Sequence, residues 1–171
     1  RARWLFAVAR WACIPFSLLG GYLCWRWAGE LYGEFGGTIA LVLWCLSPNV
    51  IAWSATILPD TAAAALGVAA GYCFWRWLKE PDGFNALLAG ITLGLAQLTK
   101  MTWIVLFALW PLVWVVWIGR RRRAPVKIPR RSQAIQLAGL LVTGLFVLNL
   151  GYGFEGTFTR LGRFTFVSRT L

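Results

Sequence analysis

Long apolar runs, separated by short polar segments, occupy most of this sequence. The first run covers residues 4–27 and holds only two charged residues, Arg10 and Arg26. A helix needs about 20 predominantly apolar residues to cross the hydrocarbon core of a bilayer. Because 59% of the 171 residues are hydrophobic and only 13% are charged, the composition is that of an integral membrane protein rather than of a soluble domain.

The apolar runs predict an all-α fold, a polytopic transmembrane helical bundle that forms a single domain over residues 1–171. The short segments between the runs leave room for about six spans. The predicted spans are residues 4–27, 36–53, 61–77, 84–99, 101–118 and 133–152. In the fourth of these, Gly90 and Gly94 form a stripe of small residues, which predicts close packing against another helix.

The densest charge in the sequence is the basic loop at residues 119–132, GRRRRAPVKIPRRS. Loops rich in Lys and Arg stay on the cytoplasmic side of a membrane. This loop is therefore predicted to be cytoplasmic, and alternation of the spans makes residues 153–171 an extracytoplasmic tail. The net charge of +11 is then explained by topology and by contact with anionic membrane lipids, which disfavours nucleic acid as a partner.

A Trp-Arg-Trp cluster ends both the first and the third span, at residues 25–27 and 75–77, and a tyrosine precedes each cluster by three residues. Aromatic and basic residues of this kind anchor helices at the membrane interface. Two spans return the chain to the same face of the membrane. Both clusters are therefore predicted to lie on the cytoplasmic side.

Residue types that bind metals are scarce. The chain has no histidine, and its four cysteines lie inside apolar runs without a CxxC pair. No metal site is predicted from these residues. Whether a divalent metal takes part in function is left open by the sequence.

Residues 47–60, SPNVIAWSATILPD, interrupt the apolar pattern and end on a carboxylate. Pro48 removes a backbone donor and restricts Ser47, so a helix is predicted to break there. An ionisable group near bilayer depth costs roughly 2.5–3.5 kcal/mol on insertion scales, which makes Asp60 a candidate site residue facing an aqueous or substrate-lined cavity. Aspartate is also favoured as a helix N-cap, so a capping role for Asp60 is an equal alternative.

The predicted topology places Lys100 on the same extracytoplasmic side as Asp60. A carboxylate can orient or deprotonate a hydroxyl or amine nucleophile, and a lysine can hold a phosphate as a point charge. The two residues are therefore predicted to bind substrate, with Asp60 in a supporting catalytic role. The alternative for Lys100 is that its ammonium snorkels to lipid headgroups.

Two stretches, residues 47–65 (SPNVIAWSATILPDTAAAA) and 87–112 (LLAGITLGLAQLTKMTWIVLFALWPL), resemble a known family. It is that of the protein O-mannosyltransferase-like glycosyltransferases, family 39 of the GT-C fold, which includes the bacterial lipid A aminoarabinose transferases. The resemblance covers residues 28–118, and GLAQLTK at 94–100 is its most distinctive part.

The resemblance implies a membrane glycosyltransferase of the bacterial plasma (inner) membrane. Such an enzyme moves a sugar from a polyprenyl-phosphate donor to a lipid or protein acceptor at the extracytoplasmic face. In the family, the principal catalytic carboxylate lies in a large first extracytoplasmic loop, which this chain lacks. The chain thus resembles a fragment that begins after the loop and is inactive alone. The alternative function is a transporter or flippase, because broken helices form the substrate sites of such proteins.

Overall fold

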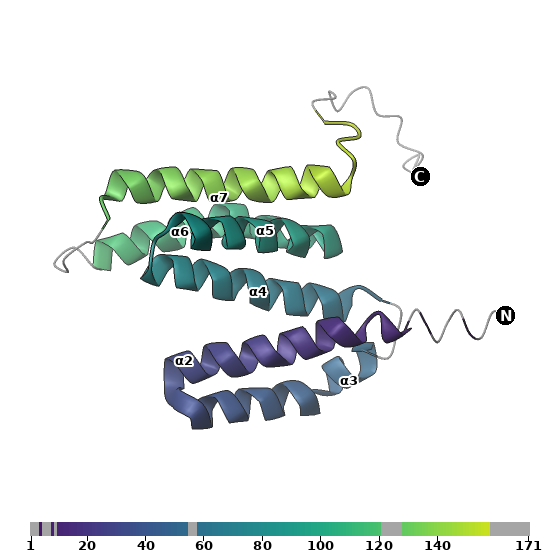
Figure 1. The fold of residues 1–171 in the computed structure, drawn as a ribbon. Helices are drawn as coiled ribbons and strands as arrows, with labels where there is room; N and C mark the ends of the chain where they lie inside the picture. The colour runs from purple at the N-terminus through teal and green to yellow at the C-terminus, as the bar shows by residue number, and fades with distance from the viewer. Residues whose placement is uncertain (1–3, 5–7, 9, 55–57, 121–127, 158–171) are drawn as a thin grey trace, which may run out of the picture.

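The computed structural model describes residues 4, 8, 10–54, 58–120 and 128–157, which form helices and turns and no strand (Figure 1). The elements are α2 (Ile14–Leu46), α3 (Pro48–Ser54), α4 (Asp60–Lys79), α5 (Gly83–Thr99), the 3-10 helix η1 (Met101–Ile104), α6 (Val105–Arg120) and α7 (Arg130–Gly151). The prediction of an all-α helical bundle is confirmed.

Two stretches among the described residues are long and apolar enough to cross a membrane. They are Met101–Arg120, which joins η1 to α6, and α7. The bent pair of α2 and α3 counts as a third candidate, and α5 is a shorter apolar helix. The chain is therefore an integral membrane protein. Its division into six spans stays a prediction.

Helix α2 is folded back on itself at Gly33, whose backbone (φ 83°, ψ 176°) leaves helical geometry. Figure 1 shows the two arms of α2 lying side by side. The indole Nε1 of Trp44 on the second arm donates to the Ser17 carbonyl on the first, at 3.0 Å. The predicted spans 4–27 and 36–53 leave residues 28–35 as the expected loop between them. That loop is shorter than predicted, because a single glycine with positive φ reverses the chain and its neighbours stay helical.

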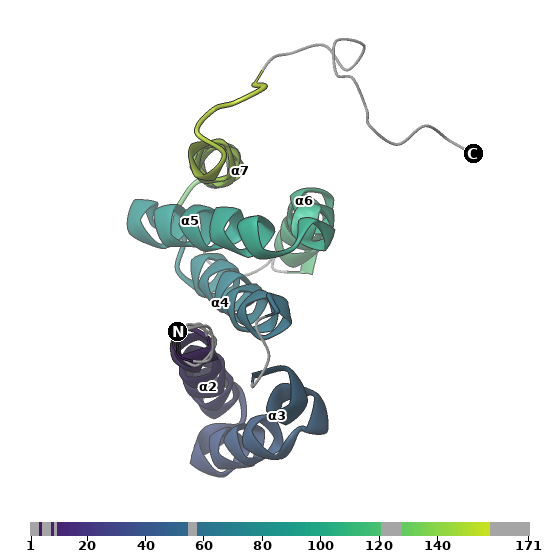
Figure 2. The same ribbon diagram turned by 90° about the vertical axis from the view of Figure 1, so that its right-hand side faces the viewer.

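The break predicted at Pro48 is present. Helix α2 ends at Leu46, Ser47 is extended, and α3 begins at Pro48. The axes of α2 and α3 differ in direction by 53°. This short helix leads toward the start of α4, which packs along the first arm of α2 (Figure 2).

The centre of the bundle is α5, which lies between α4 and α7 (Figures 1 and 2). Small residues allow the helices to approach closely. A Cβ at Gly90 would come within 2.6 Å of the Leu140 carbonyl oxygen of α7, and one at Gly94 within 2.7 Å of the Gly144 carbonyl oxygen. The predicted close packing of the Gly90–Gly94 stripe is confirmed, and its partner is α7.

Large aromatic residues extend this core between α4, α6 and α7. The Phe74 ring of α4 stacks on the Trp110 ring of α6 at a centroid distance of 4.3 Å. Trp77 is fully buried, and its Nε1 donates to the Gln136 side chain of α7 at 2.9 Å. A buried indole needs such a partner, because an unpaired buried donor is costly. These contacts tie α4 to both α6 and α7.

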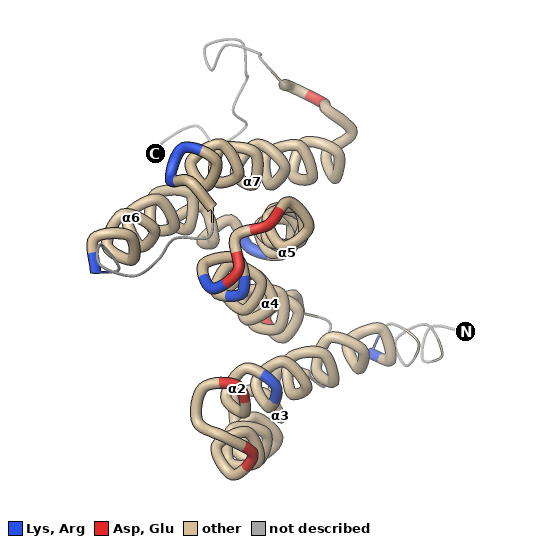
Figure 3. Tube along the Cα trace, turned by 60° about the vertical axis from the view of Figure 1, so that its left-hand side comes forward, with Lys and Arg blue, Asp and Glu red and all other residues tan. Residues whose placement is uncertain are grey.

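The charged residues gather toward the helix ends (Figure 3). One end of the bundle holds the bend of α2, the α4–α5 turn, the end of α6 and the start of α7 (Figure 1). The opposite end holds α3, the start of α4, the end of α5 with η1, and the end of α7. Most of the predicted basic loop, residues 121–127, and tail residues 158–171 lie outside the described residues.

Candidate functional site

The two residues predicted to form the site are in direct contact. Lys100 Nζ donates to Asp60 Oδ1 at 2.9 Å, and the two side chains are 50% and 37% exposed. The pair joins the start of α4 to the end of α5, which are 40 residues apart in sequence. An exposed ion pair contributes only about 0–1 kcal/mol to stability. Both charges are therefore accessible to a ligand without a large loss of folding energy.

Local backbone geometry positions each of the two charges. Asp60 is the first residue of α4, where its negative charge is favoured by the helix dipole. The N-cap position belongs to Pro59, which makes no side-chain cap. The alternative prediction that Asp60 is the N-cap is therefore wrong by one position. Lys100 is the C-cap of α5 and is extended (φ −155°, ψ 121°), which separates α5 from η1.

Two buried polar residues beside this pair were missed by sequence reasoning. Gln97 is 1% exposed, and neither its amide oxygen nor its amide nitrogen has a hydrogen-bond partner within the described part of the chain. The same holds for the hydroxyl of Thr61, which is 4% exposed. Gln97 precedes Lys100 by three residues, and Thr61 follows Asp60. A glutamine inside the apolar run GLAQL was the available signal.

The two Trp-Arg-Trp clusters meet at the other end of the bundle. Arg26 Nε donates to the Tyr72 hydroxyl at 2.9 Å, and that hydroxyl donates to Glu30 Oε1 at 2.7 Å. The rings of Trp27 and Trp75 lie 6.1 Å apart. The two clusters lie on one side of the bundle, as predicted, and the assignment of that side to the cytoplasm stays a prediction. The polar network that joins the clusters was not predicted.

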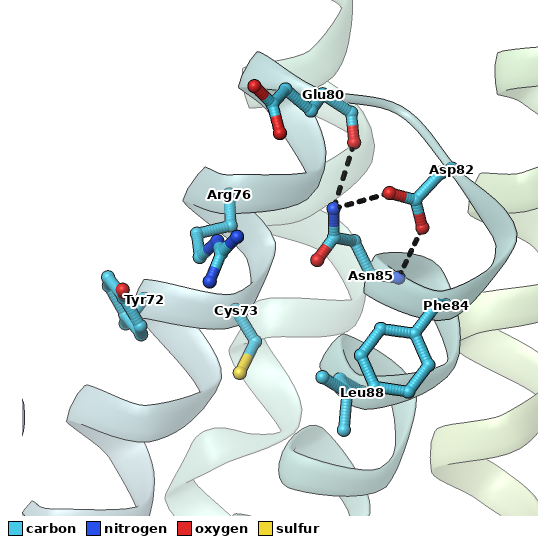
Figure 4. Close-up of a pocket in the computed structure, with 8 residues that line it drawn as sticks. All are labelled: Tyr72, Cys73, Arg76, Glu80, Asp82, Phe84, Asn85 and Leu88. Atoms are coloured by element: carbon cyan, nitrogen blue, oxygen red, sulfur yellow. Dashed lines mark hydrogen bonds between the residues drawn. The ribbon is translucent and has the colours of Figure 1, made fainter.

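Beside this network, a pocket of about 220 Å³ lies between the end of α4 and the start of α5 (Figure 4). Helix α4 and the turn after it contribute Tyr72, Cys73, Arg76 and Glu80, and the other wall is formed by Asp82, Phe84, Asn85 and Leu88. Asp82 is the N-cap of α5. Its Oδ1 accepts from the Asn85 backbone N–H and its Oδ2 from Asn85 Nδ2, both at 2.7 Å.

Metal ligands do not converge anywhere in the described ranges. No group of three or more His, Cys, Asp or Glu side chains within them could hold a metal ion. The chemistry available at the Asp60–Lys100 end is that of one carboxylate, one ammonium and the buried polar groups of Gln97 and Thr61.

Comparison with known proteins gives one match. Residues 5–149 match the model of the dolichyl-phosphate-mannose-protein mannosyltransferase family. No curated protein and no solved structure matches the chain. The match includes the Ser47–Pro48 break, Asp60, the Gly90–Gly94 stripe and Lys100. The chain therefore belongs to the dolichyl-phosphate-mannose-protein mannosyltransferase family and is a membrane glycosyltransferase of the GT-C type.

Proposed function

We propose that this protein transfers a sugar from a polyprenyl-phosphate donor to a lipid or protein acceptor, and that Asp60 and Lys100 form part of the site. The observation that carries the proposal is the 2.9 Å contact between these two half-exposed charges at one end of the bundle. Within the described residues, the other ion pair joins Arg26 to Glu30 near the opposite end. The Asp60–Lys100 pair lies in the part of the chain that matches the family.

Asp60 and Lys100 have different roles in the proposed sugar transfer. In an inverting transfer, a hydroxyl or amine of the acceptor attacks the anomeric carbon of the sugar. The bond from that carbon to the donor phosphate breaks, and polyprenyl phosphate leaves with the bonding electrons. The Lys100 ammonium binds the donor phosphate as a point charge and stabilises the negative charge that develops on the phosphate as the bond breaks. Asp60 orients the acceptor in a supporting role, and the proton that the acceptor loses passes to a carboxylate that acts as general base.

The ion pair also has a role in the unloaded site. A free lysine beside lipid headgroups would attract any phosphate, and a free aspartate at a helix end would be hydrated. In the ion pair, each side chain restrains the other across the contact between the start of α4 and the end of α5. The pair opens when the donor phosphate competes for the ammonium.

Orientation in the membrane is part of the proposal. The basic residues Arg120, Arg130 and Arg131 end α6 and begin α7 at the end of the bundle opposite to Lys100. By the positive-inside rule, that end faces the cytoplasm, and Asp60 and Lys100 face the extracytoplasmic side of a bacterial plasma membrane. Transfer then takes place on the outer side.

The test is sugar transfer by the full-length protein in liposomes, with a polyprenyl-phosphate sugar as donor. Lys100→Ala is expected to lower kcat/KM for the donor roughly 10–150-fold, because a charge-assisted contact contributes about 1.5–3 kcal/mol. Asp60→Asn is expected to lower kcat with a smaller change in donor KM. Lys79→Ala is the matched control, since Lys79 lies at the other end of α4 and packs over the Trp75 ring.

Wild-type turnover by the Lys100→Ala variant would remove Lys100 from the mechanism. An equal loss in the Lys79→Ala variant would attribute the effect to general surface charge. The same liposomes test the alternative function: uptake of the sugar into the lumen without transfer to an acceptor would indicate a transporter, which the family match disfavours.

A further inference from the structure

The pocket between α4 and α5 lies at the end of the bundle away from Asp60 and Lys100, and the proposed transfer does not use it (Figure 4). Its surroundings place it at the level of lipid headgroups. Trp75 precedes Arg76 on α4, and the Lys79 ammonium lies 4.3 Å from the centre of the Trp75 ring. Tryptophan and basic residues concentrate at the interface between the hydrocarbon core and water.

The charges around the pocket are of both signs. Arg76 supplies a guanidinium, and Glu80 and Asp82 supply carboxylates. Arg76 and Glu80 form no ion pair within 4.0 Å in the described part of the chain, although they are one helical turn apart. Asp82 accepts two bonds from Asn85, but an ionised carboxylate has about four acceptor positions, so it keeps both charge and acceptor capacity.

Mixed charge restricts the kind of ligand that fits. A purely anionic group at Arg76 would lie beside two carboxylates, and a purely cationic group at Glu80 would lie beside the guanidinium. A ligand that carries both charges satisfies all three residues. Because like charges at close range are costly and opposite charges favourable, the arrangement selects a zwitterion.

The order of the residues along the helices matches one zwitterion in particular. Arg76 lies one turn farther from the end of α4 than Glu80, and therefore deeper in the bundle. On α5, Phe84 is 69% exposed and Leu88 continues the apolar wall one turn farther in. In phosphatidylethanolamine the phosphate lies next to the glycerol and acyl chains, and the ammonium lies outermost.

The geometry points to a binding site for a phosphatidylethanolamine lipid. The Arg76 guanidinium binds the phosphate, Glu80 and Asp82 accept from the primary ammonium, and an acyl chain lies along Phe84 and Leu88. Phosphatidylcholine has no N–H to donate, and phosphatidylglycerol has no cation, so both fit less well. The apolar wall of Phe84 and Leu88 contacts an acyl chain, so it favours a lipid over a soluble headgroup compound without one.

The test is lipid retention by the full-length protein, measured by native mass spectrometry after release from nanodiscs. The nanodiscs contain equal amounts of phosphatidylethanolamine, phosphatidylcholine and phosphatidylglycerol with identical acyl chains. The wild-type protein is expected to retain phosphatidylethanolamine preferentially. Arg76→Gln is expected to reduce that retention about tenfold, which is the effect of losing one charge-assisted contact. Glu80→Gln is expected to abolish the preference for phosphatidylethanolamine over phosphatidylglycerol.

Lys79→Gln is the matched control, because it removes a neighbouring positive charge that does not line the pocket. Retention in this variant is expected to equal that of the wild type. Wild-type retention by Arg76→Gln, or an equal loss in Lys79→Gln, would overturn the proposal. If Arg76→Gln does not fold, an unchanged lipid preference in Glu80→Gln overturns it alone. Equal competition by soluble glycerophosphoethanolamine would contradict a lipid ligand.

Discussion

The Asp60–Lys100 pair is made by side chains that the sequence places 40 residues apart. Hydropathy and the positive-inside rule predicted that both residues lie at the same side of the bundle. The contact itself depends on where α4 starts and where α5 ends, and Pro59 and the extended Lys100 backbone fix those two positions. Gln97 could not be identified in this way, because nothing in a run of apolar residues shows whether a lone amide is buried with or without a partner.

Gln97 gives a prediction about stability. Its amide is buried without a partner among the described residues, so Gln97→Leu is expected to stabilise the fold by about 1–3 kcal/mol, the cost of an unsatisfied buried group. Gln133→Leu is the matched control. Gln133 is also buried, but its Nε2 donates to the Ile128 carbonyl at 3.0 Å, so its loss is expected to destabilise.

Thermal unfolding of the full-length variants in one detergent measures both effects. Destabilisation by Gln97→Leu, equal to that by Gln133→Leu, would contradict the reading of Gln97 as an unpaired group. It would indicate that the amide has a partner supplied by another segment.

At the level of helices, the sequence was most informative where a pattern is local. Apolar runs located the helices, Pro48 located the break, and the Gly90–Gly94 spacing predicted a close contact. The partner of that contact could not be derived, because any neighbouring helix can supply the facing surface. The loop predicted at 28–35 was too long, since polar Gly-rich composition does not distinguish a loop from two helix ends that meet at Gly33.

Glycine packing between α5 and α7 gives a second prediction. A Cβ at Gly90 would lie 2.6 Å from the Leu140 carbonyl oxygen and 2.7 Å from Thr143 Cβ, so Gly90→Ala is expected to destabilise by about 1–3 kcal/mol through overpacking. Gly139→Ala on α7 is the control. An added Cβ there meets nothing within 4 Å, so the change is expected to be neutral or to stabilise by up to about 1 kcal/mol.

The denaturation midpoints of the Gly90→Ala and Gly139→Ala variants test this predicted difference in stability. Equal midpoints would show that α5 and α7 can separate without cost, and would remove the contact as a source of stability.

For the whole molecule, the bundle has two ends of different character. One end holds the Asp60–Lys100 pair, and the other holds the Trp-Arg-Trp clusters, the α4–α5 pocket and the basic residues that end α6 and begin α7. The sequence predicted from hydropathy and charge that Asp60 and Lys100 lie on the side opposite to the Trp-Arg-Trp clusters and the basic residues. It could not predict the Arg26–Tyr72–Glu30 network or the pocket, because both depend on how tightly α2, α4 and α5 pack.

Topology provides the prediction at this scale. In a background without native cysteines, Glu155→Cys is expected to react with a membrane-impermeant maleimide in intact cells. Gly119→Cys, next to the basic residues at the end of α6, is expected to react only after the cells are permeabilised. The reverse pattern would invert the orientation and place sugar transfer by Asp60 and Lys100 on the cytoplasmic side.

The bend of α2 at Gly33 has a practical consequence for protein engineering. Residues 30–35 are exposed, and an added Cβ at Gly33 meets nothing within 4 Å. The positive φ there disfavours other residues, but a flexible insert would not have to adopt it. Exposed turns of this kind accept added sequence with little loss of stability. The tip of the α2 hairpin is therefore the place to introduce an epitope or a fluorescent reporter while both of its arms stay packed.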